Sequence, residues 1–275
     1  MKATLVSGEY PWQVALRPQG IKLIDNLDVV FHALTNAGID GWEGFVPDEK
    51  EAGTLSTLLA KHSLSMPSAY ANLRLHEPDS DRVIAETIAS IPRLRKLGVR
   101  FLEVNPEPIA WGSPLDKDDA QLRRQAINLQ ALGIQLLAGE IELCYHTHDP
   151  EMRQSAREFH HMLQATDPMV VGFNLDPHWI YRGCGNSQIA LEDILDLYGD
   201  RIRTVHLRQS IGGIWSETLG EGDLDYEPII DVLKAIDFDG VLVLEQAAEP
   251  GTPETMPMAE RERLNAAWAR KVFGL

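Results

Sequence analysis

The sequence is poor in cysteine and has no long apolar run. Cys144 and Cys184 are the two cysteines in 275 residues, too few for a disulfide framework. We therefore expect two reduced thiols and, by default, a cytoplasmic protein. No stretch of 18 apolar residues occurs, so no segment is expected to span a membrane. The first residues, MKATLVSGEYPWQ, lack the apolar core and cleavage site expected of a signal peptide.

Positive charge is also scarce. The chain has 25 Lys and Arg residues against 41 Asp and Glu, a net charge of −16 at pH 7. Such a charge repels a phosphate backbone, and no run of Lys or Arg suggests a basic groove, so we expect no nucleic-acid partner. The surplus of carboxylates fits solubility and also a site that gives oxygen ligands to a cation. No linker rich in Pro, Gly or Ser divides the chain, which predicts one domain over residues 1–275.

Short apolar or β-branched runs alternate with longer amphipathic stretches. In the longer stretches the apolar residues recur at spacings of three and four, which is typical of helices. Strands are expected at residues 12–16, 41–46, 64–70, 99–105, 141–148, 170–176, 202–208 and 240–246. Helices are expected at residues 26–37, 48–62, 80–97, 117–138, 151–165, 187–198, 226–236 and 255–272.

This alternation predicts an α/β protein with a parallel sheet. Eight strand–helix units in 275 residues fit a single closed (β/α)8 TIM barrel. The alternative is an open doubly wound sheet, which would want a glycine-rich phosphate-binding turn after an early strand, and none is present. We therefore predict the barrel and expect its chemistry at the carboxyl ends of the strands.

The expected fifth strand carries two histidines near its end, in the segment ELCYHTHDPEM (142–152). Side chains alternate between the two faces of a strand, so one face holds Glu142, Cys144, His146 and His148. That face reads as the barrel interior, with His148 nearest the mouth. Glu151 starts the next helix or lies in the loop before it.

The next three strands also end in ionisable residues. Asp176 ends the sixth strand, His206 lies near the end of the seventh with Arg208 on the same face, and Glu245 ends the eighth. Each of these residues alone could be a polar plug in the barrel mouth. Four consecutive strand ends of this kind favour a site with mixed oxygen and nitrogen ligands, suited to Mn²⁺, Mg²⁺, Co²⁺ or Zn²⁺. The second and fourth strands add Glu43 and Glu103.

From about residue 97 to 247 the motifs resemble those of the xylose-isomerase-like TIM barrels. These are the sugar phosphate isomerase/epimerase relatives, which include inosose dehydratases and ketose 3-epimerases. The resemblance rests on YHTHDPE, NLDPHW, TVHLRQS and GEGDLDYEPIIDVLKAIDFDGVLVLEQ, in that order. The first three strands match only in pattern. The motif order is more specific for the superfamily than for any substrate.

The resemblance implies a metal held by four residues on strands five to eight: Glu151, Asp176, His206 and Glu245. The first ligand has two candidates. Some relatives read YHNH..E, with the glutamate just after the histidine pair, which matches Glu151. Others carry the glutamate inside the strand, which makes Glu142 the alternative. One departure stands out, because relatives often read VHLKD where this chain has VHLRQ, so Gln209 replaces a carboxylate.

The implied activity is a sugar or keto-polyol isomerase or epimerase that transfers a proton next to a carbonyl through a metal-stabilised enediolate. Mn²⁺ is the first choice of cofactor, with Mg²⁺, Co²⁺ or Zn²⁺ as alternatives. Glu151 and Glu245 would be both ligands and the catalytic acid–base pair. The residues expected to bind substrate are His148, His178, Arg208, Glu43, Glu103 and Trp111, with Trp179 as a further apolar face.

Other functions remain open at this point. The same residues would serve a dehydratase or lyase that expels a β-hydroxyl or a glycosidic oxygen from a keto-sugar. A non-catalytic sugar-binding barrel is the alternative from another class. An AP-endonuclease-like nuclease on the same fold would need more metal ligands and basic loops, which the net charge disfavours. A homo-oligomer is a family-level expectation only.

Overall fold

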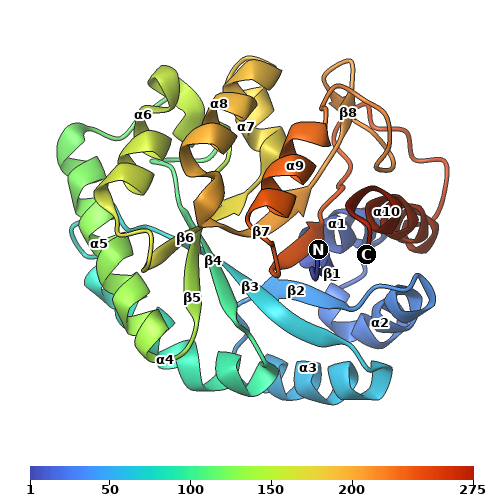
Figure 1. The fold of residues 1–275 in the computed structure, drawn as a ribbon. Helices are drawn as coiled ribbons and strands as arrows, with labels where there is room; N and C mark the ends of the chain where they lie inside the picture. Colours follow the sequence, from blue (N-terminus) through green and yellow to red (C-terminus); the bar gives the residue numbers. More distant parts are fainter.

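The computed structural model describes all residues, 1–275, as a closed barrel of parallel strands surrounded by helices (Figure 1). Neighbouring strands follow the order β1-β10-β7-β6-β5-β4-β3-β2, which closes on itself. The strands are β1 (Thr4–Gly8), β2 (Gly41–Phe45), β3 (Ser65–Leu73), β4 (Phe101–Pro106), β5 (Glu142–Tyr145), β6 (Val171–Leu175), β7 (Ile202–Leu207) and β10 (Val241–Leu244). The predicted (β/α)8 barrel is confirmed.

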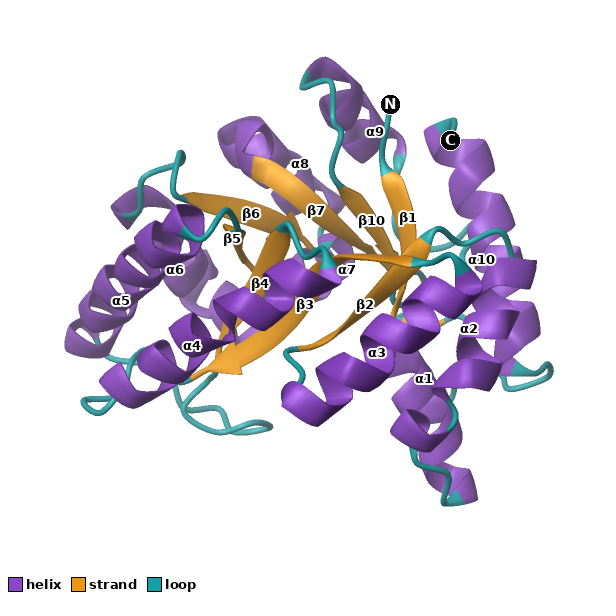
Figure 2. Ribbon diagram, turned by 90° about the horizontal axis from the view of Figure 1, so that it is seen from below, coloured by secondary structure: helices purple, strands orange, loops and turns teal.

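The helices form a ring outside the strands (Figure 2). They are α1 (Glu9–Leu16), α2 (Leu27–Asn36), α3 (Glu49–His62), α4 (Asp81–Leu97), α5 (Asp119–Ala138), α6 (Asp149–Ala165), α7 (Pro177–Gly183), α8 (Gln188–Tyr198), α9 (Glu227–Ala235) and α10 (Met258–Phe273). A short hairpin of β8 (Ser210–Ile211) and β9 (Ile214–Trp215) lies in the loop after β7. None of the helices is long and apolar enough to cross a membrane.

The prediction for the first strand is wrong. Residues 12–16 lie in α1, and the strand is Thr4–Gly8, which pairs with β10 on one side and β2 on the other. A short apolar run such as WQVAL fits a helix or a strand equally well, so periodicity alone could not decide. In α1 the run buries Trp12, whose indole Nε1–H donates to Ser7 Oγ at 3.1 Å. The other seven strands lie where they were predicted, with ends shifted by up to three residues.

Apolar side chains fill the part of the barrel interior away from the carboxyl ends of the strands. Val6, Phe101, Cys144, Val241 and Val243 form a buried cluster of their own, apart from the larger core between strands and helices. Cys144 therefore points inward, as the alternation along the fifth strand predicted. This apolar plug leaves the carboxyl end of the barrel as the place where ionisable side chains meet.

The loop that follows β7 is held by the side chain of Gln209, which is fully buried. Its Nε2 donates to the carbonyl oxygens of Gly220 and Leu224 at 3.1 and 3.0 Å. Its Oε1 accepts from the backbone N–H groups of Ser210 and Leu224 at 2.9 and 3.0 Å. A Cβ on Gly222 would collide with this side chain. The amide of Gln209 supplies two donors and an acceptor, whereas the carboxylate that relatives often have at this position of VHLRQ could only accept.

A second buried polar group lies between α10 and the barrel. Glu262 is fully buried with Ser7 and Asn265 as polar neighbours, and burial raises the pKa of its carboxyl to about 8. Asn265 in turn accepts a hydrogen bond through Oδ1 from the backbone N–H of Leu219 at 2.8 Å. The protonated carboxyl of Glu262 thus belongs to the packing that supports the loop after β7.

Gln209→Glu should destabilise the protein and loosen this loop. A carboxylate cannot donate to Gly220 and Leu224, and each buried carbonyl left unsatisfied costs about 1–3 kcal/mol. Urea unfolding and amide hydrogen exchange over residues 210–224 measure both effects. Glu221→Gln, an exposed change in the same loop, is the control and should shift stability by less than about 0.5 kcal/mol. Unchanged unfolding of Gln209→Glu would contradict the assigned role.

Glu262→Gln should flatten the pH dependence of stability. A glutamate ordinarily titrates near 4.5 and Glu262 near 8, so between these values the native state binds one more proton than the unfolded chain. The free energy of unfolding should therefore fall as the pH rises through this window, by on the order of 1 kcal/mol per pH unit. Urea unfolding at several pH values tests this, with Glu221→Gln expected to keep the wild-type slope. Parallel profiles for wild type and Glu262→Gln would show that Glu262 ionises normally.

Candidate active site

Three of the predicted metal ligands meet at the carboxyl end of the barrel. Asp176 directly follows β6, His206 lies in β7, and Glu245 directly follows β10. All three are buried, and each offers one ligand atom within 4.8 Å of the other two. The Nδ1 atom of His206 lies 2.5 Å from Oε2 of Glu245. The structure therefore brings together one imidazole and two carboxylates from three neighbouring strands.

The other ring nitrogen of His206 faces two more carboxylates. Its Nε2 lies 2.5 Å from Oε2 of Glu103 and 3.1 Å from Oε1 of Glu43. Glu43 also accepts a hydrogen bond from Ser68 Oγ at 2.5 Å. A carboxylate on the far nitrogen is the usual partner of a metal-binding histidine, because it fixes the ring and its tautomer. Glu103 is fully buried behind His206 and does not line the cavity, so it does not take the substrate-binding position expected from the sequence.

Neither glutamate considered for the first ligand joins this cluster. Glu142 is the first residue of β5, half exposed at the opposite end of the strand, and pairs with Arg203 at 3.3 Å. Glu151 lies in the first turn of α6, where its Oε2 accepts the backbone N–H of His148 at 2.7 Å in a capping box. It is fully buried, and it neither lines the cavity nor lies in either candidate metal group.

His146 is the side chain that reaches the cluster from the end of β5. It groups with Glu103 and His206, with ligand atoms within 4.8 Å of one another. Its Nδ1 lies 2.6 Å from Oδ1 of Asn174, whose amide donates to Thr204 Oγ1 at 2.6 Å. That contact places the proton on Nδ1. Burial lowers the pKa of His146 well below its ordinary value, so Nε2 keeps a lone pair.

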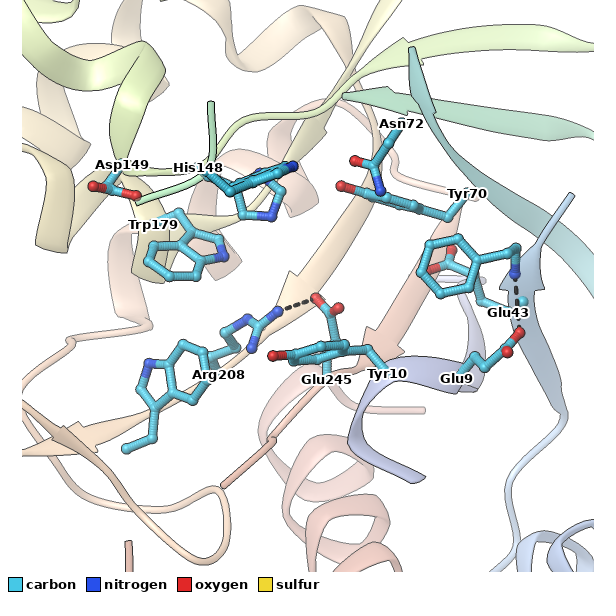
Figure 3. A pocket seen from close by; sticks show the side chains of 14 residues that line it. Glu9, Tyr10, Glu43, Tyr70, Asn72, His148, Asp149, Trp179, Arg208 and Glu245 are labelled. Atoms are coloured by element: carbon cyan, nitrogen blue, oxygen red, sulfur yellow. Dashed lines mark hydrogen bonds and ion pairs between the residues drawn. The ribbon is translucent and has the colours of Figure 1, made fainter. Parts of the chain in front are cut away.

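Arg208 joins the two carboxylates of the first group. Its Nη2 lies 2.6 Å from Oε2 of Glu245 (Figure 3). Its Nε lies 3.3 Å from Oδ2 of Asp176. The guanidinium carbon lies 4.7 and 5.7 Å from the ring centroids of Trp215 and Trp179. Cation–π contacts on both indoles and two charged partners hold the guanidinium in one place.

These contacts set the charge of the cluster. Burial opposes ionisation of Glu245, but Arg208 and His206 outweigh it and hold the pKa of Glu245 below its ordinary value. Burial also opposes protonation of His206, but the carboxylates around it outweigh that and raise its pKa well above the ordinary value. Burial, reinforced by the negative charge of Glu43, raises the pKa of Glu103 to about 8.

The cluster has room for further positive charge. Its carboxylates are Glu43, Asp176 and Glu245, besides Glu103, which its raised pKa of about 8 keeps mostly protonated at pH 7, whereas its cations are Arg208 and the protonated ring of His206. A surplus of buried carboxylate oxygens beside a histidine nitrogen fits a divalent cation of the Mn²⁺, Mg²⁺, Co²⁺ or Zn²⁺ type. The donor set of Asp176, His206 and Glu245 thus fits the metal that the resemblance implies.

A cavity of about 380 Å³ opens above the cluster, within the usual range for small-molecule sites. Five residues predicted from the sequence line it or its floor: Glu43, Trp111, His148, Arg208 and Glu245. Trp179 lines it as well. Burial, reinforced by the positive charge of Arg208, lowers the pKa of His148 to about 3, so this imidazole is neutral.

His178 does not reach the cavity. It is fully buried, and its Nδ1 accepts the indole N–H of Trp215 at 3.3 Å, so it supports Trp215. The prediction that His178 binds substrate is therefore not met by this geometry. Asp176 is the N-cap residue of α7. Its Oδ1 accepts hydrogen bonds from the backbone N–H groups of His178 and Trp179 in the first turn.

Sequence reasoning missed Tyr70, Asn72 and Trp215 in the cavity wall. Tyr70 and Asn72 follow Ser68 at alternate positions of β3, so continuing the third strand to Leu73 would have placed them on the interior face. Trp215 lies in the β8–β9 hairpin, for which the sequence gave no periodic signal.

Known proteins share this architecture. An inosose dehydratase from Clostridium botulinum (strain Eklund 17B / Type B) is 24% identical over 255 residues, covering 82% of this chain and 84% of that protein. A D-psicose 3-epimerase from Clostridium cellulolyticum H10 superposes with a TM-score of 0.75 at 14% identity, covering 98% of this chain and 99% of that one. A 3-keto-D-glucoside 4-epimerase from E. coli superposes with a TM-score of 0.69 at 15% identity, covering 98% and 100%. The family model described as "Xylose isomerase-like TIM barrel" matches residues 31–271, and the chain belongs to that family.

Proposed function

We propose that this protein is a divalent-metal-dependent isomerase or epimerase that moves a proton next to the carbonyl of a sugar or keto-polyol. The observation that carries the proposal is the group of Asp176, His206 and Glu245 at the floor of a cavity of sugar-binding size. The names of the similar proteins, inosose dehydratase and D-psicose 3-epimerase, indicate substrates that are sugars or related polyols. The strongly negative chain and the acidic floor argue for an uncharged substrate.

Asp176, His206 and Glu245 would hold the metal, Mn²⁺ in the first instance. We propose the neutral ring of His146, which groups with Glu103 and His206, as the fourth donor, in the place that the sequence gave to Glu151. Glu103 and Glu43 would orient His206 from behind. A bound divalent cation supplies positive charge beside the carbon that loses its proton and so stabilises the negative charge that forms there.

Glu245 is the proposed base. It lines the cavity and is kept ionised by Arg208 and His206. A substrate oxygen that accepts hydrogen bonds from the guanidinium of Arg208 in place of Glu245 would weaken the ion pair between them. The pKa of Glu245, and so its basicity, would then rise. His148 lies across the cavity as a neutral imidazole suited to binding a hydroxyl (Figure 3). The indoles of Trp179 and Trp215 cover Arg208 and keep water from it.

A dehydratase is the second candidate, and a specific asymmetry favours it. Glu245 is a buried ionised carboxylate, whereas the far wall offers neutral His148 and the half-exposed Asp149. One acid–base group suffices for elimination if Glu245 removes the proton next to the carbonyl and passes it to the β-hydroxyl, which then leaves as water. Sequence relatives over most of the chain are inosose dehydratases.

The test of the proposal is solvent deuterium incorporation into a panel of keto-sugars and inososes, with Mn²⁺ supplied. We expect exchange next to the carbonyl, and the product distinguishes epimer, isomer and dehydrated compound. Glu245→Gln should lower the exchange rate by at least about a hundredfold, the usual worth of a positioned base. Glu221→Gln is the control and should exchange at the wild-type rate. Absence of exchange by the wild type across the panel would overturn the proposed function.

Metal binding separates the two assignments of the fourth ligand. Asp176→Asn should weaken Mn²⁺ binding by at least about tenfold, whereas Glu151→Gln should leave it unchanged, because glutamine keeps the capping box. Isothermal titration with Mn²⁺ and metal analysis of the purified protein measure this. Equal loss of affinity in both variants would restore Glu151 as a ligand, and no loss in Asp176→Asn would remove the proposed site.

A further inference from the structure

The cavity above the cluster does not stand alone. A wider groove of about 600 Å³ adjoins it, and the two share Trp111 and Asp149 in their walls. The groove runs between the loop after β4 and the start of α6. Its further lining comes from Ser113, Asp116, Arg153 and Gln154, among others. Trp111 thus separates an inner space over Glu245 from an outer space at the surface.

The two spaces differ in chemistry. The inner cavity combines an acidic floor with aromatic walls, whereas the groove has Trp111 as its single aromatic residue, beside Pro114 and Pro150. The indole of Trp111 is 52% exposed and packs edge-on against His148 with ring centroids 5.1 Å apart. A sugar ring has an apolar face of C–H groups and a rim of hydroxyls. An exposed indole among polar side chains matches both features.

The groove is built by specific contacts on both sides. Asp116 pairs with Arg153 at 3.3 Å and accepts from Gln154 Nε2 at 3.1 Å, which ties the loop to α6. Behind them, Lys117 pairs with Glu158 at 2.5 Å in a buried contact. The loop that carries Trp111 is therefore fixed in place at its carboxyl end.

Backbone strain lies at the same place. Gln154, Ser155 and Ala156 have φ values of 53°, 60° and 55°, and Arg153 is also non-helical, so α6 is broken here. A left-handed conformation costs a non-glycine residue about 1–2 kcal/mol. Strain of this kind persists where surrounding contacts impose it and is frequent at ligand sites. The break turns Arg153 and Gln154 toward the groove.

We propose that the groove is a subsite for a second sugar ring, so that the substrate is a glycoside of a keto-sugar. The reacting ring would lie in the inner cavity beside Glu245 and Arg208. The second ring would stack on Trp111 and place its hydroxyls against Asp149, Asp116 and Arg153. This substrate class rests on the proposed function, but occupation of the groove is a matter of binding and can be measured without turnover.

Binding of unreactive sugars tests the subsite. Isothermal titration and tryptophan fluorescence would compare glucose with maltose, cellobiose and trehalose on the Mn²⁺-loaded protein. We expect at least one disaccharide to bind about tenfold or more tightly than glucose, as one additional well-formed contact surface allows. Equal affinity for glucose and every disaccharide, or no binding of any disaccharide, would overturn the subsite.

Variants locate the binding. Arg153→Ala changes a residue that lines the groove and not the inner cavity, and Trp111→Ala removes the stacking platform. Both should abolish the advantage of the disaccharide over glucose, and Trp111→Phe should restore part of it. Arg82→Ala, an exposed arginine on α4, is the matched control and should keep the wild-type ratio. An unchanged ratio in Arg153→Ala and Trp111→Ala would place the second ring elsewhere and refute the proposal.

Turnover separates this proposal from the proposed function. In the deuterium exchange assay, Arg153→Ala, a change confined to the groove, should lower kcat/KM for a keto-disaccharide at least about tenfold and change the value for the free keto-monosaccharide much less. Absence of exchange with either compound would refute the proposed reaction, while the titrations with disaccharides would still decide on the groove. Equal losses for both compounds would show that Arg153 does not act through a second ring and would refute the subsite.

Discussion

The site depends on mutual compensation among six buried ionisable groups. Four carboxylates share a small volume with the guanidinium of Arg208 and the imidazole of His206, all nine-tenths buried or more. An isolated ion in such a place would cost several kcal/mol, so each charge is tolerable only while its partners stay in position. His206 touches three of the carboxylates and Arg208 touches two. Removing one partner from such a set typically costs about 3–5 kcal/mol, so stability and function are coupled here.

The charged cluster is linked to the surrounding loop by pairs of consecutive residues at two neighbouring strand ends. After β7, Arg208 faces the cluster and the next residue, Gln209, holds the loop. After β10, Glu245 faces the cluster and the next residue, Gln246, accepts from the backbone N–H of Gln209 at 2.7 Å. The loop that these two glutamines hold carries Trp215, which stacks on Arg208. The outer loop and the inner charges therefore hold each other in position, and neither can move alone.

The alternation of side chains along a strand determined how much of the site could be predicted from the sequence. Asp176, His206 and Glu245 stand at or next to the ends of strands whose position the apolar runs fix, so a barrel brings them together. At the fifth strand alternation decides less, and the choice of Glu151 as a ligand rested on the family resemblance. The strand ends at Tyr145 and α6 begins at Asp149, so the alternation stops before His148 and Glu151 becomes a helix-capping residue. Sequence spacing does not reveal where a strand ends.

The choice between helix and strand at residues 12–16 and the path of the loop after β7 depend on tertiary contacts. Both α1 and β1 contain short apolar runs, and pairing with β2 and β10 selects Thr4–Gly8 as the strand. Side-chain hydrogen bonds fix the hairpin that carries Trp215: Ser210 donates through its N–H to Gln209 Oε1 and through Oγ to Asp223. Gln246 Nε2 donates to the carbonyl oxygen of Gln209 just before it. Such contacts join residues far apart along the chain, so no local sequence pattern predicts them. This is why Trp215 was missed and His178 was placed in the cavity.

The charge pattern also bears on the outcome of the reaction. Arg208 and His206 keep Glu245 ionised by lowering its pKa, so it becomes an effective base only when a bound substrate weakens its contact with Arg208, whereas burial keeps His148 on the far wall neutral. Epimerisation needs a group on the far face that can return a proton, and a neutral imidazole with a depressed pKa is a poor proton donor. Elimination needs strong stabilisation on one face and a path for the leaving hydroxyl. Glu43 is a second buried carboxylate in the cavity lining, so both reactions have a candidate acid–base group besides Glu245.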